Sequence, residues 1–552
     1  LERIDRGEDL ATEIRYPIQT ISFGDALAWV FLPGEVVVDY ATRLKREFDG
    51  GRLVIHAYAN ACPGYVPSER ILTEGGYEGG QAQIYYDIPA PYAPGLEDRI
   101  VAAVRRQIDG RFQPPFDASR TGGVSPLPPR QALATLRAPP GFKVELIAAE
   151  PMVESPVAVA FGPDARIWVA EMADYPSGMP DGPPGGRIRC LEDVDGDGRP
   201  DRSTVFLEGI PFPTGVTPWR DGVLVCAAPD ILFARDTDGD GRADHSEAIF
   251  TGFATHNYQA RVNGLEYALD GGLEGSCGLF GGEITSLRHG AVLALGARDF
   301  RIDPDAGTIE PASGSSQQGR VRNDAGDWFG CTNSLPAIHF PLVEAWLRRN
   351  PDAAARRTAV PILSAPGPGQ LFPVSPQVLF ELSGPPGQST AACGLGVYRD
   401  DLLGTPEAGP FTGDLFTCEP VNNLVHHQRP VSVGVTFAGA RVAGEETREF
   451  LASTDPWFRP VQIRTGPDGA LWVVDMYRYV IEHPIWIPDG TRAKLDLRAG
   501  ADRGRIYRIV PEGRSLRPVR HLDRLSTTEL LQAFDSPNGT VRDLVQQLSL
   551  IH

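Results

Sequence analysis

The hydrophobic pattern changes character along the chain. Near the N-terminus, short apolar runs at Ala26–Phe31 and Arg52–Ala59 predict buried strands, and the apolar spacing in Gly34–Phe48 and Leu96–Ile108 predicts helices. Beyond residue 140, apolar and polar positions alternate between turns rich in Gly, Pro and Asp, which predicts β-strands. We therefore expect an α/β fragment followed by a mainly β region.

One phrase recurs in the β region. Val159–Met172 reads VAFGPDARIWVAEM and Gln462–Met476 reads QIRTGPDGALWVVDM, with weaker copies at Trp219–Ala228 and Asn263–Ser276. The first copies follow one another at about 50 residues, and the rest of the region fits four more units, or three with an insertion. A hairpin repeated at this period is typical of a β-propeller, whose blades stack around an axis. An unrelated β-sandwich with common turn residues is the alternative.

The composition of the connecting segments divides the chain further. A capping box at Ser526–Glu529 precedes apolar residues at helical spacing (Leu530, Leu531 and Phe534). A single helical hairpin cannot bury its apolar face alone, so we expect the start of a HEAT-like repeat there. The expected parts are the α/β fragment (1–112), a Pro/Gly-rich linker (113–140), the propeller (141–512) and the helical tail (513–552).

Charge and cysteine content exclude several classes. The net charge of −19 has the wrong sign for a general nucleic-acid binder. No apolar stretch is long enough for a membrane span. The seven cysteines form no CxxC or CxxCH, so neither a thiolate zinc site nor a haem attachment motif is present. We favour separate buried thiols, and a Cys393–Cys418 disulfide is the alternative.

Two Asp-rich loops share the pattern DxDGDGxxD, about one blade apart. Ca²⁺ takes six to eight oxygen ligands, which carboxylates at positions 1, 3, 5 and 9 and the carbonyl of position 7 would supply. The second loop also has Glu at position 12, as an EF-hand does. The alternative is a metal-free Asp/Gly turn. The predicted ligands of these structural calcium sites are Asp193, Asp195, Asp197, Arg199, Asp201, Asp236, Asp238, Asp240, Arg242, Asp244 and Glu247.

Polar residues also gather near the predicted blade ends. In a propeller they would face the central channel and suit an oxygen-rich or anionic ligand, with a His as general base. For each of them a structural hydrogen bond is the alternative. We select His256, His339, Asp475 and Arg478 as catalytic candidates, and Asn263, Asn333 and Arg459 as cofactor-binding candidates.

The phrases FLPGEVVVDYATRLKRE, YANACPGYVPSER and EGGYEGG resemble the end of the amidase domain of neutral/alkaline ceramidases. In that family two His, a Glu and a Tyr hold a zinc ion that activates water. The match places the Glu at Glu35 and the Tyr at Tyr65, and the part that bears the histidines has no counterpart here. The resemblance therefore implies half of a zinc site.

The phrases VAFGPDARIWVAEMADYP, HNYQARVNGLEY, DWFGCTNS and FRPVQIRTGPDGALWVVDMYRYVIEHP resemble the propeller of PVC-type membrane-bound dehydrogenase proteins. These look like distant relatives of soluble quinoprotein glucose/sorbosone dehydrogenases. The resemblance implies six blades, with seven as the alternative, a periplasmic or extracellular location, and pyrroloquinoline quinone as a cofactor. It also implies a haem electron-acceptor domain outside this chain.

Three functional hypotheses follow. The first is a quinoprotein-type dehydrogenase that oxidises a carbohydrate-like alcohol. The second is a non-catalytic, calcium-stabilised propeller that binds a glycan or a protein. The third is a zinc-dependent N-acyl amidase seated on the first part of the chain, which would need histidines supplied from elsewhere.

Overall fold

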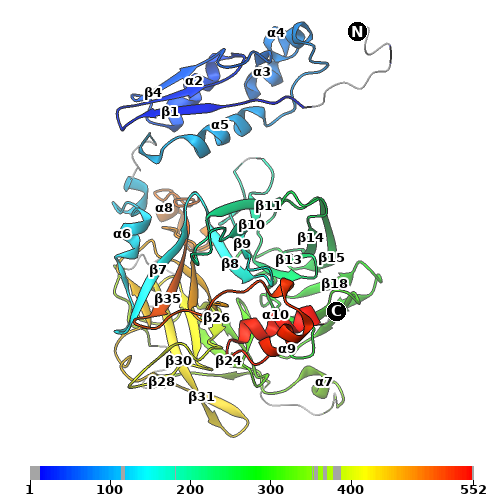
Figure 1. Cartoon of the computed structure of the whole chain (residues 1–552), viewed down its shortest axis with the longest axis vertical. Helices are drawn as coiled ribbons and strands as arrows, with labels where there is room; N and C mark the ends of the chain where they lie inside the picture. The colour runs from blue at the N-terminus through cyan, green and yellow to red at the C-terminus, as the bar shows by residue number, and fades with distance from the viewer. Residues whose placement is uncertain are drawn as a thin grey trace. The chain divides into compact units, whose positions relative to one another are not determined.

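The structure is a computed structural model that describes residues 6, 13–112, 118–180, 182–350, 352, 358–364, 370–376 and 387–549. It divides into two compact units, Leu1–Ala118 and Ser119–His552, each of which is described by itself (Figure 1). Within the described ranges, no helix is long and apolar enough to cross a membrane.

The first unit packs two helices on one face of a small sheet. The sheet has the order β1-β2-β4, with β1 antiparallel and β4 parallel to β2. Its core joins Val30, Leu44 and Val104, which are fully buried. The main elements are β1 (Gln19–Phe23), β2 (Leu27–Phe31), β3 (Glu35–Val36), α2 (Val38–Glu47), β4 (Leu53–His56), β5 (Tyr65–Val66), α3 (Glu69–Glu74), α4 (Gly76–Gly79) and α5 (Leu96–Gln107).

The helix expected over Gly34–Phe48 begins only at Val38. Gly34 has a φ of 77°, and a Cβ at this position would lie 2.5 Å from the carbonyl oxygen of Gly64. Glu35 and Val36 instead form the short strand β3, which runs parallel to β5. The close approach of two chain segments at Gly34 therefore delays the helix by one turn.

The second unit is mainly β and contains six sheets of four or more strands, which we number in chain order, and a two-stranded sheet of β27 (Gly404–Thr405) and β28 (Gly409–Pro410). Sheets 1, 3, 4 and 6 have four strands each, and sheets 2 and 5 carry additional strands at the outside. Sheet 1 is β8 (Pro156–Phe161), β9 (Ile167–Glu171), β10 (Gly186–Glu192) and β11 (Arg202–Ile210); sheet 2 is β12 (Gly215–Trp219), β13 (Gly222–Ala227), β14 (Asp230–Arg235), β15 (His245–Phe253), β18 (Gly282–Ser286) and β19 (Val292–Ala294); sheet 3 is β16 (Asn263–Tyr267), β17 (Leu273–Ser276), β20 (Phe300–Asp303) and β21 (Thr308–Pro311).

The remaining three sheets follow in the same way. Sheet 4 is β22 (Arg320–Arg322), β23 (Trp328–Thr332), β24 (Leu335–His339) and β25 (Val360–Pro361); sheet 5 is β26 (Cys393–Val397), β29 (Leu415–Glu419), β30 (Leu424–Val433), β32 (Leu451–Ser453) and β6 (Leu136–Arg137), with β31 (Thr436–Ala440) paired to β30; sheet 6 is β33 (Pro460–Thr465), β34 (Leu471–Asp475), β35 (Arg505–Pro511) and β7 (Phe142–Ala149).

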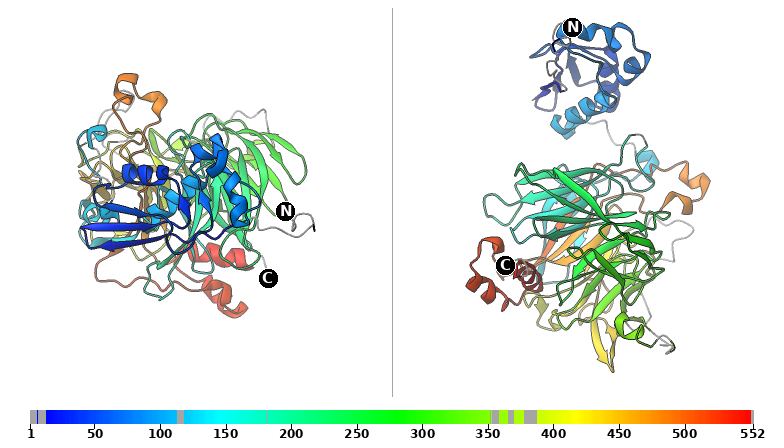
Figure 2. Two further views of the ribbon diagram at one scale, coloured as in Figure 1. Left: turned by 90° about the horizontal axis from the view of Figure 1, so that it is seen from above. Right: turned by 90° about the vertical axis from the view of Figure 1, so that its right-hand side faces the viewer.

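The first strands of the sheets form a closed ring. β8, β12, β16, β22, β26 and β33 contact one another in that order, and β33 contacts β8 again. β7, which precedes sheet 1 in the chain, pairs with β35 and so holds both ends of the β region in sheet 6 (Figures 1 and 2). These contacts define a β-propeller, in which each sheet buries its faces against its two neighbours.

The recurring sequence phrase marks one structural feature, the hairpin of the two innermost strands. Val159–Met172 covers the turn from β8 to β9, and Gln462–Met476 covers the turn from β33 to β34. The weaker copies cover the same hairpins of sheets 2 and 3. In the last copy, Asp468 accepts hydrogen bonds from Trp472 Nε1 at 3.0 Å and from Ala470 N at 3.1 Å. The turn aspartate therefore fastens the start of the second strand.

Part of the segment expected as a linker packs on the second unit. α6 (Pro129–Leu133) precedes β6, which pairs with β32 at the outside of sheet 5. Leu127 N donates to Tyr477 Oη at 2.8 Å, and Leu127 O accepts from Arg505 Nη2 at 2.8 Å. This part of the Pro-rich stretch is therefore fixed by hydrogen bonds.

The tail contains α9 (Thr527–Ala533) and α10 (Gly539–Ser549), drawn in red beside the sheets in Figure 2. The capping box is present, since Ser526 Oγ accepts from Glu529 N and Glu529 Oε2 accepts from Ser526 N. Leu530, Leu544 and Val545 are buried in one cluster with core residues of sheets 2 and 3. The propeller therefore covers the apolar face of this hairpin, while Leu531 and Phe534 stay exposed.

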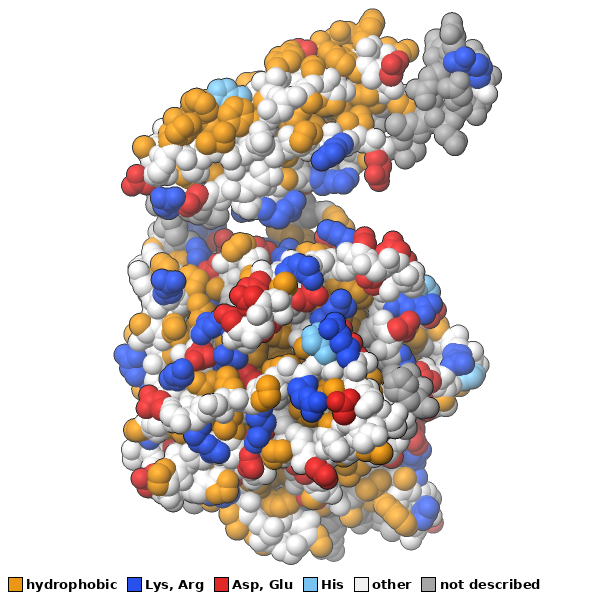
Figure 3. Space-filling model, in the orientation of Figure 1, with side chains coloured by type: hydrophobic (Ala, Val, Ile, Leu, Met, Phe, Trp, Pro, Cys, Tyr) orange, Lys and Arg blue, Asp and Glu red, His pale blue; other side chains and the backbone are white. Residues whose placement is uncertain are grey.

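The surface of the second unit carries basic and acidic side chains interspersed over the face seen in Figure 3. Many charged side chains of this unit pair with one another, as do Arg301 with Asp270 and Arg235 with Asp221. The acidic net charge therefore does not gather into one large field on this face.

Candidate functional site

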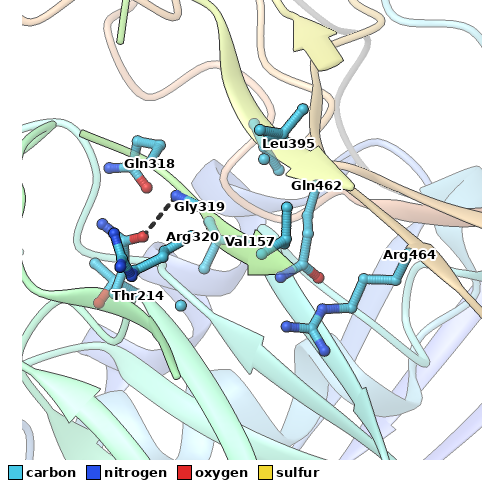
Figure 4. A pocket seen from close by; sticks show the side chains of 13 residues that line it. Val157, Thr214, Gln318, Gly319, Arg320, Leu395, Gln462 and Arg464 are labelled. Atoms are coloured by element: carbon cyan, nitrogen blue, oxygen red, sulfur yellow. Dashed lines mark hydrogen bonds between the residues drawn. The ribbon is translucent and has the colours of Figure 1, made fainter. Parts of the chain in front are cut away.

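The centre of the ring is a narrow channel, and the charged side chains that line it pair with carboxylates of the surrounding sheets. It has a volume of about 30 Å³ and is lined among others by Thr214, Gln318 and Gln462 (Figure 4). Two arginines also line it. Arg320 is held by Glu274 and Asp299 at 2.6 and 2.8 Å, and Arg464 by Glu266 at 2.7 Å. Because both guanidinium groups are already paired with carboxylates, they are not available to bind a ligand in the channel.

A larger cavity of about 140 Å³ opens at one end of this channel, and we call it the axial cavity. It shares Val157, Thr214, Gln318 and Val461 with the channel. Its neutral hydrogen-bonding residues are Thr214, Gln259, Gln317, Gln318, Asn333, Thr390, Tyr175 and Tyr258; its other residues are Val157, Met172, Ala391, Cys393, Pro420, Val421, Val461, Met476, Ile481 and Glu482.

All six sheets and their connecting loops contribute to this lining. Met172 follows the second strand of sheet 1 and Met476 follows the second strand of sheet 6, so the repeated hairpin delivers a methionine to the cavity twice. Tyr258 and Gln259 come from the segment just before β16. A site built at the axis therefore depends on the ring being closed.

A hydrogen-bond network fixes one wall of the axial cavity. Gln259 Nε2 donates to Tyr175 Oη and to Ile481 O, both at 3.0 Å, and Tyr175 Oη donates to Ile481 O at 2.5 Å. The neighbouring Glu482 accepts from His483 N at 2.8 Å. Burial raises the pKa of Glu482 above its usual range. The wall thus presents amide and hydroxyl groups beside one carboxyl group.

Among the described residues that line the axial cavity, none is Lys, Arg or His. His483 lies just behind the wall, with its ring stacked on Tyr258 at 5.1 Å between centroids. Arg261 lies over the same Tyr258 ring at 4.8 Å and donates to backbone carbonyls of Thr255 and Asn257. The lining therefore suits an uncharged polar ligand better than an anion.

Two of the candidate residues chosen from the sequence lie at the axis. Asn333 is exposed and lines the axial cavity, and its backbone N donates to Gln317 Oε1 at 3.2 Å. Asn263 lines the channel, where Nδ2 donates to Gln317 O at 2.7 Å and Oδ1 accepts from Gly319 N at 2.8 Å. Asn263 thus joins sheets 3 and 4.

Three further candidates are buried outside the cavity lining. Arg459 donates to the carbonyls of Pro420, Arg478 and Tyr479 at 2.6 to 2.9 Å. Arg478 Nη2 donates to Ser155 Oγ at 2.9 Å. Burial lowers the pKa of Arg459 to about 10 and that of Arg478 to about 9. Both side chains hold the loop that leads to Glu482, so their contacts are with backbone and neighbouring sheets.

Asp475 accepts hydrogen bonds from the backbone at the end of β34. Its Oδ1 accepts from Arg459 N at 2.8 Å and from Tyr477 N at 2.9 Å. Burial raises the pKa of Asp475 to about 7. Asp475 therefore fixes the exit of β34 beside Met476, which lines the cavity.

The two candidate histidines lie away from the cavity lining. His256 is exposed, with its ring at 4.4 Å from that of Phe280. His339 lies in the third strand of sheet 4, where Nδ1 is 2.9 Å from Thr436 Oγ1 and burial lowers its pKa. In the structure neither residue lines the axial cavity.

The sequence pattern does not single out Tyr175, Gln318 or Glu482. Gln259 lies three positions after His256 in the polar segment predicted to face the channel, from which only His256 is chosen as a catalytic candidate. Glu482 lies just before His483 in the phrase YRYVIEHP. Tyr175 gives no signal in a single sequence, because only the closed ring brings it to the axis, and Cys393 is singled out only as a possible disulfide partner of Cys418.

The two Asp-rich loops occupy the same position in consecutive sheets. The first joins β10 to β11 and the second joins β14 to β15, which are the third and fourth strands of sheets 1 and 2. In each loop, ligand atoms of the first three aspartates lie within 4.8 Å of one another: Asp193, Asp195 and Asp197, and Asp236, Asp238 and Asp240. Three carboxylates that converge in this way provide oxygen ligands that suit Ca²⁺.

The other predicted ligands have different contacts. Asp201 Oδ2 accepts from Val194 N at 2.9 Å, and Asp244 Oδ1 accepts from Thr237 N at 2.9 Å. Glu247 lies on β15, 3.5 Å from His245. Position 9 therefore closes each loop through backbone hydrogen bonds.

Both loops also contact the sheet before their own. At the first loop, Gly198 O accepts from Arg508 Nη1 of sheet 6 at 3.0 Å, and Arg199 Nη1 donates to Leu146 O of β7 at 2.8 Å. At the second loop, Ala243 N donates to Phe206 O of sheet 1 at 2.8 Å. The Arg242 guanidinium of the second loop also lies 4.0 Å from Glu208 of sheet 1. A cation that orders either loop would thus also strengthen a junction between neighbouring sheets.

In the first unit, Glu35 and Tyr65 are direct partners across β3 and β5. Hydrogen bonding to the Glu35 carboxylate raises the pKa of Tyr58 to about 12. The one histidine of the described unit 1 residues, His56, lies on the outer face of the sheet between the rings of Trp29 and Phe31. Unit 1 thus supplies two oxygen ligands, whereas a zinc site needs three or four protein ligands.

Comparison with known proteins gives a family without an assigned role. Residues 128–513 match the model of the family described as "Domain of unknown function (DUF7133)". The match covers more than half of the chain, so the chain belongs to this family. No curated protein matches.

Three of the solved structures that match the chain are sugar dehydrogenases or proteins described in that way. A putative oxidoreductase (glucose dehydrogenase) from Thermus thermophilus is 16% identical, with 67% of this chain and 100% of that chain covered and a TM-score of 0.37. The soluble aldose sugar dehydrogenase of Escherichia coli is 14% identical, with coverage of 67% and 100% and a TM-score of 0.36. The PQQ-bound aldose sugar dehydrogenase of Streptomyces coelicolor is 15% identical, with coverage of 68% and 100% and a TM-score of 0.33.

Proposed function

We propose that the second unit is a six-bladed β-propeller that binds a single uncharged sugar ring, or a similar polyol, in the axial cavity. The two Asp-rich loops would hold structural calcium ions. By the resemblance of its motifs, the protein would work in the periplasm or outside the cell. The observation that carries this proposal is the composition of the axial cavity lining, which combines amide and hydroxyl groups with a single carboxyl group.

The chemistry of the lining supports a sugar. Amide side chains such as Gln318 and Asn333 both donate and accept, which matches the paired donor and acceptor character of hydroxyl groups. Tyr258, Met172 and Met476 offer apolar surface to the C–H face of a ring. A volume of about 140 Å³ is close to the ~150 Å³ cavity that holds benzene, which is the scale of one six-membered ring.

The dehydrogenase hypothesis also requires a place for pyrroloquinoline quinone, which carries three carboxylates. The described residues that line the axial cavity supply no cation to pair with them. The axial cavity therefore does not fit the quinone, and we derive no redox step. The hypothesis makes a distinct prediction, which is dye reduction by protein incubated with the quinone and Ca²⁺ over a panel of sugars.

Calorimetric titration tests the proposal. We expect glucose or myo-inositol to bind and the anion gluconate to bind at least tenfold more weakly, because its carboxylate would be desolvated beside Glu482. Asn333→Ala should weaken sugar binding about tenfold, the effect of one hydrogen bond of ~1.4 kcal/mol. Asn350→Ala, at an exposed position away from the cavity, should not. Gluconate that binds more tightly than every neutral sugar would contradict the proposal.

The amidase hypothesis is the second candidate, and the pairing of Glu35 with Tyr65 favours it. It would require histidines from outside the described unit 1 residues. Metal analysis of the purified chain tests it: stoichiometric zinc that disappears in Glu35→Ala would support it, and zinc-free protein would not.

A further inference from the structure

We propose that Cys393 and Cys418 form an oxidisable thiol pair in the wall of the axial cavity, and that a peroxide converts this pair into a cross-strand disulfide. The pair is a modification site distinct from the sugar-binding groups. Both residues are free thiols in the structure.

Their place in sheet 5 brings the two thiols together. Cys393 begins β26 and Cys418 lies in β29, and the two residues are direct partners in this antiparallel pair. Side chains of direct partners point to the same face, with Cβ atoms about 4.5–5.5 Å apart. A disulfide needs a Cβ separation of about 3.5–4.5 Å, so the strands have to approach only slightly. The register shift that follows Cys393 gives β26 the freedom to do so.

The axial cavity gives an oxidant a route to this pair. Cys393 lines the cavity, whereas Cys418 is fully buried behind it. The ends of the two strands are also fastened to each other, since Glu419 Oε1 accepts from Thr390 N and Ala391 N, both at 2.8 Å. The reaction would therefore proceed from the cavity inward, with Cys393 oxidised first and Cys418 resolving.

The reaction balances without any further component. The Cys393 thiolate displaces hydroxide from hydrogen peroxide and becomes a sulfenic acid, and the hydroxide takes up the thiol proton to give water. The Cys418 thiolate then attacks that sulfur, and the sulfenic oxygen leaves as a second water. Two thiols lose two electrons, which reduce one peroxide. Burial raises the pKa of both thiols, so the reaction should accelerate with rising pH.

Cys331 is a third buried thiol near this pair, and a disulfide to Cys331 would be the alternative product of oxidation. It is buried in β23 of sheet 4, and its Sγ donates to Gln318 O at 2.8 Å. The same Sγ also lies 3.8 Å from Ala392 O, next to Cys393, but Cys331 belongs to another sheet, whereas Cys393 and Cys418 are direct partners in one strand pair. Cys190 and Cys226, buried in sheets 1 and 2, are matched controls.

The test counts thiols and maps linked peptides in the full chain. After treatment of the Cys62→Ser variant, which lacks the exposed thiol, with hydrogen peroxide and then denaturation, we expect the thiols that react to fall from six to four, with one linked peptide pair that joins Cys393 to Cys418. Cys393→Ser and Cys418→Ser should each abolish the link, and Cys226→Ser should leave it intact. Folding of each variant is checked by circular dichroism.

Six reactive thiols after peroxide treatment of the folded Cys62→Ser protein, or a link that involves Cys331, would overturn the proposal. The readout is chemical and does not depend on sugar binding. A protein that forms this link but binds no sugar would refute the proposed function alone.

Discussion

Asp543 of α10 lies in a buried ion pair with Arg322 of sheet 4, at 2.5 Å between Oδ1 and Nη2. Its second oxygen accepts from Arg399, which follows the first strand of sheet 5. A single carboxylate thus joins the helical tail to two neighbouring sheets. Because the apolar side of the same hairpin is buried on sheets 2 and 3, the tail spans several sheets of the ring.

Removal of this carboxylate should destabilise the second unit strongly. Asp543→Ala leaves two buried guanidinium groups without their shared partner, and breaking a buried pair costs about 3–5 kcal/mol. Denaturant unfolding measures the change. Asp535→Ala, on the exposed turn between α9 and α10, should change the free energy of unfolding by less than about 0.5 kcal/mol. Equal effects of the two substitutions would show that the tail is not held by Asp543.

The sequence predicted the repeated hairpin because its signal is local. A Gly-Pro-Asp turn before an alternating strand is visible in one window, and Asp468 explains why the turn needs an acidic residue. The Asp-rich loops are equally local, and the structure places their first three carboxylates together. The axial cavity is different, because its residues come from all six sheets and meet only when β33 contacts β8.

The candidate catalytic and cofactor-binding residues also show what a single sequence does not reveal. Arg459 is predicted from the sequence to bind a cofactor. In the structure, its guanidinium group donates hydrogen bonds to backbone carbonyls instead. A sequence does not show that a charged side chain will be used to hold a loop. It also does not show that neutral residues such as Gln259 and Gln318 will line the cavity.

The Asp-rich loops should confer calcium-dependent stability. Asp195→Ala or Asp238→Ala should lower the melting temperature in millimolar Ca²⁺ and change it little in chelator, because metal binding to the native state adds to stability. Scanning calorimetry with and without Ca²⁺ measures this. Val194→Ala changes an exposed residue of the same loop and should behave as the parent in both conditions. A loss in chelator as large as that in Ca²⁺ would exclude metal binding at that loop.

Asp475 should make stability depend on pH. Its pKa in the folded state is raised to about 7 by burial, so between about pH 4 and pH 7 the folded state holds a proton that the unfolded state releases. The free energy of unfolding therefore falls as pH rises through this window, by up to ~1.4 kcal/mol per pH unit from this group.

The substitution Asp475→Asn isolates this contribution. The amide oxygen can still accept from Arg459 N and Tyr477 N, and the group no longer titrates. Unfolding curves at pH 5, 6 and 7 should show a shallower decline for Asp475→Asn than for the parent. Parallel pH profiles for the two proteins would mean that Asp475 is ionised throughout.

In the first unit, Glu35 should control the titration of Tyr58. The carboxylate favours the protonated phenol and raises its pKa to about 12, so Glu35→Gln should lower the pKa of Tyr58 toward its usual value near 10. Ultraviolet titration of the tyrosines, compared with a Tyr58→Phe variant to assign the signal, measures the shift. Glu74→Gln, at an exposed position on α3, should leave it unchanged. An unaltered pKa of Tyr58 in Glu35→Gln would contradict the contact.

A crystal structure of the protein grown with the tightest-binding neutral sugar tests most directly whether the closed ring of sheets creates a neutral sugar site at its axis. We expect one ring in the axial cavity, with hydroxyl groups within hydrogen-bond distance of Gln318 or Asn333. A sugar bound elsewhere, with the axial cavity filled only by water, would contradict the proposed site.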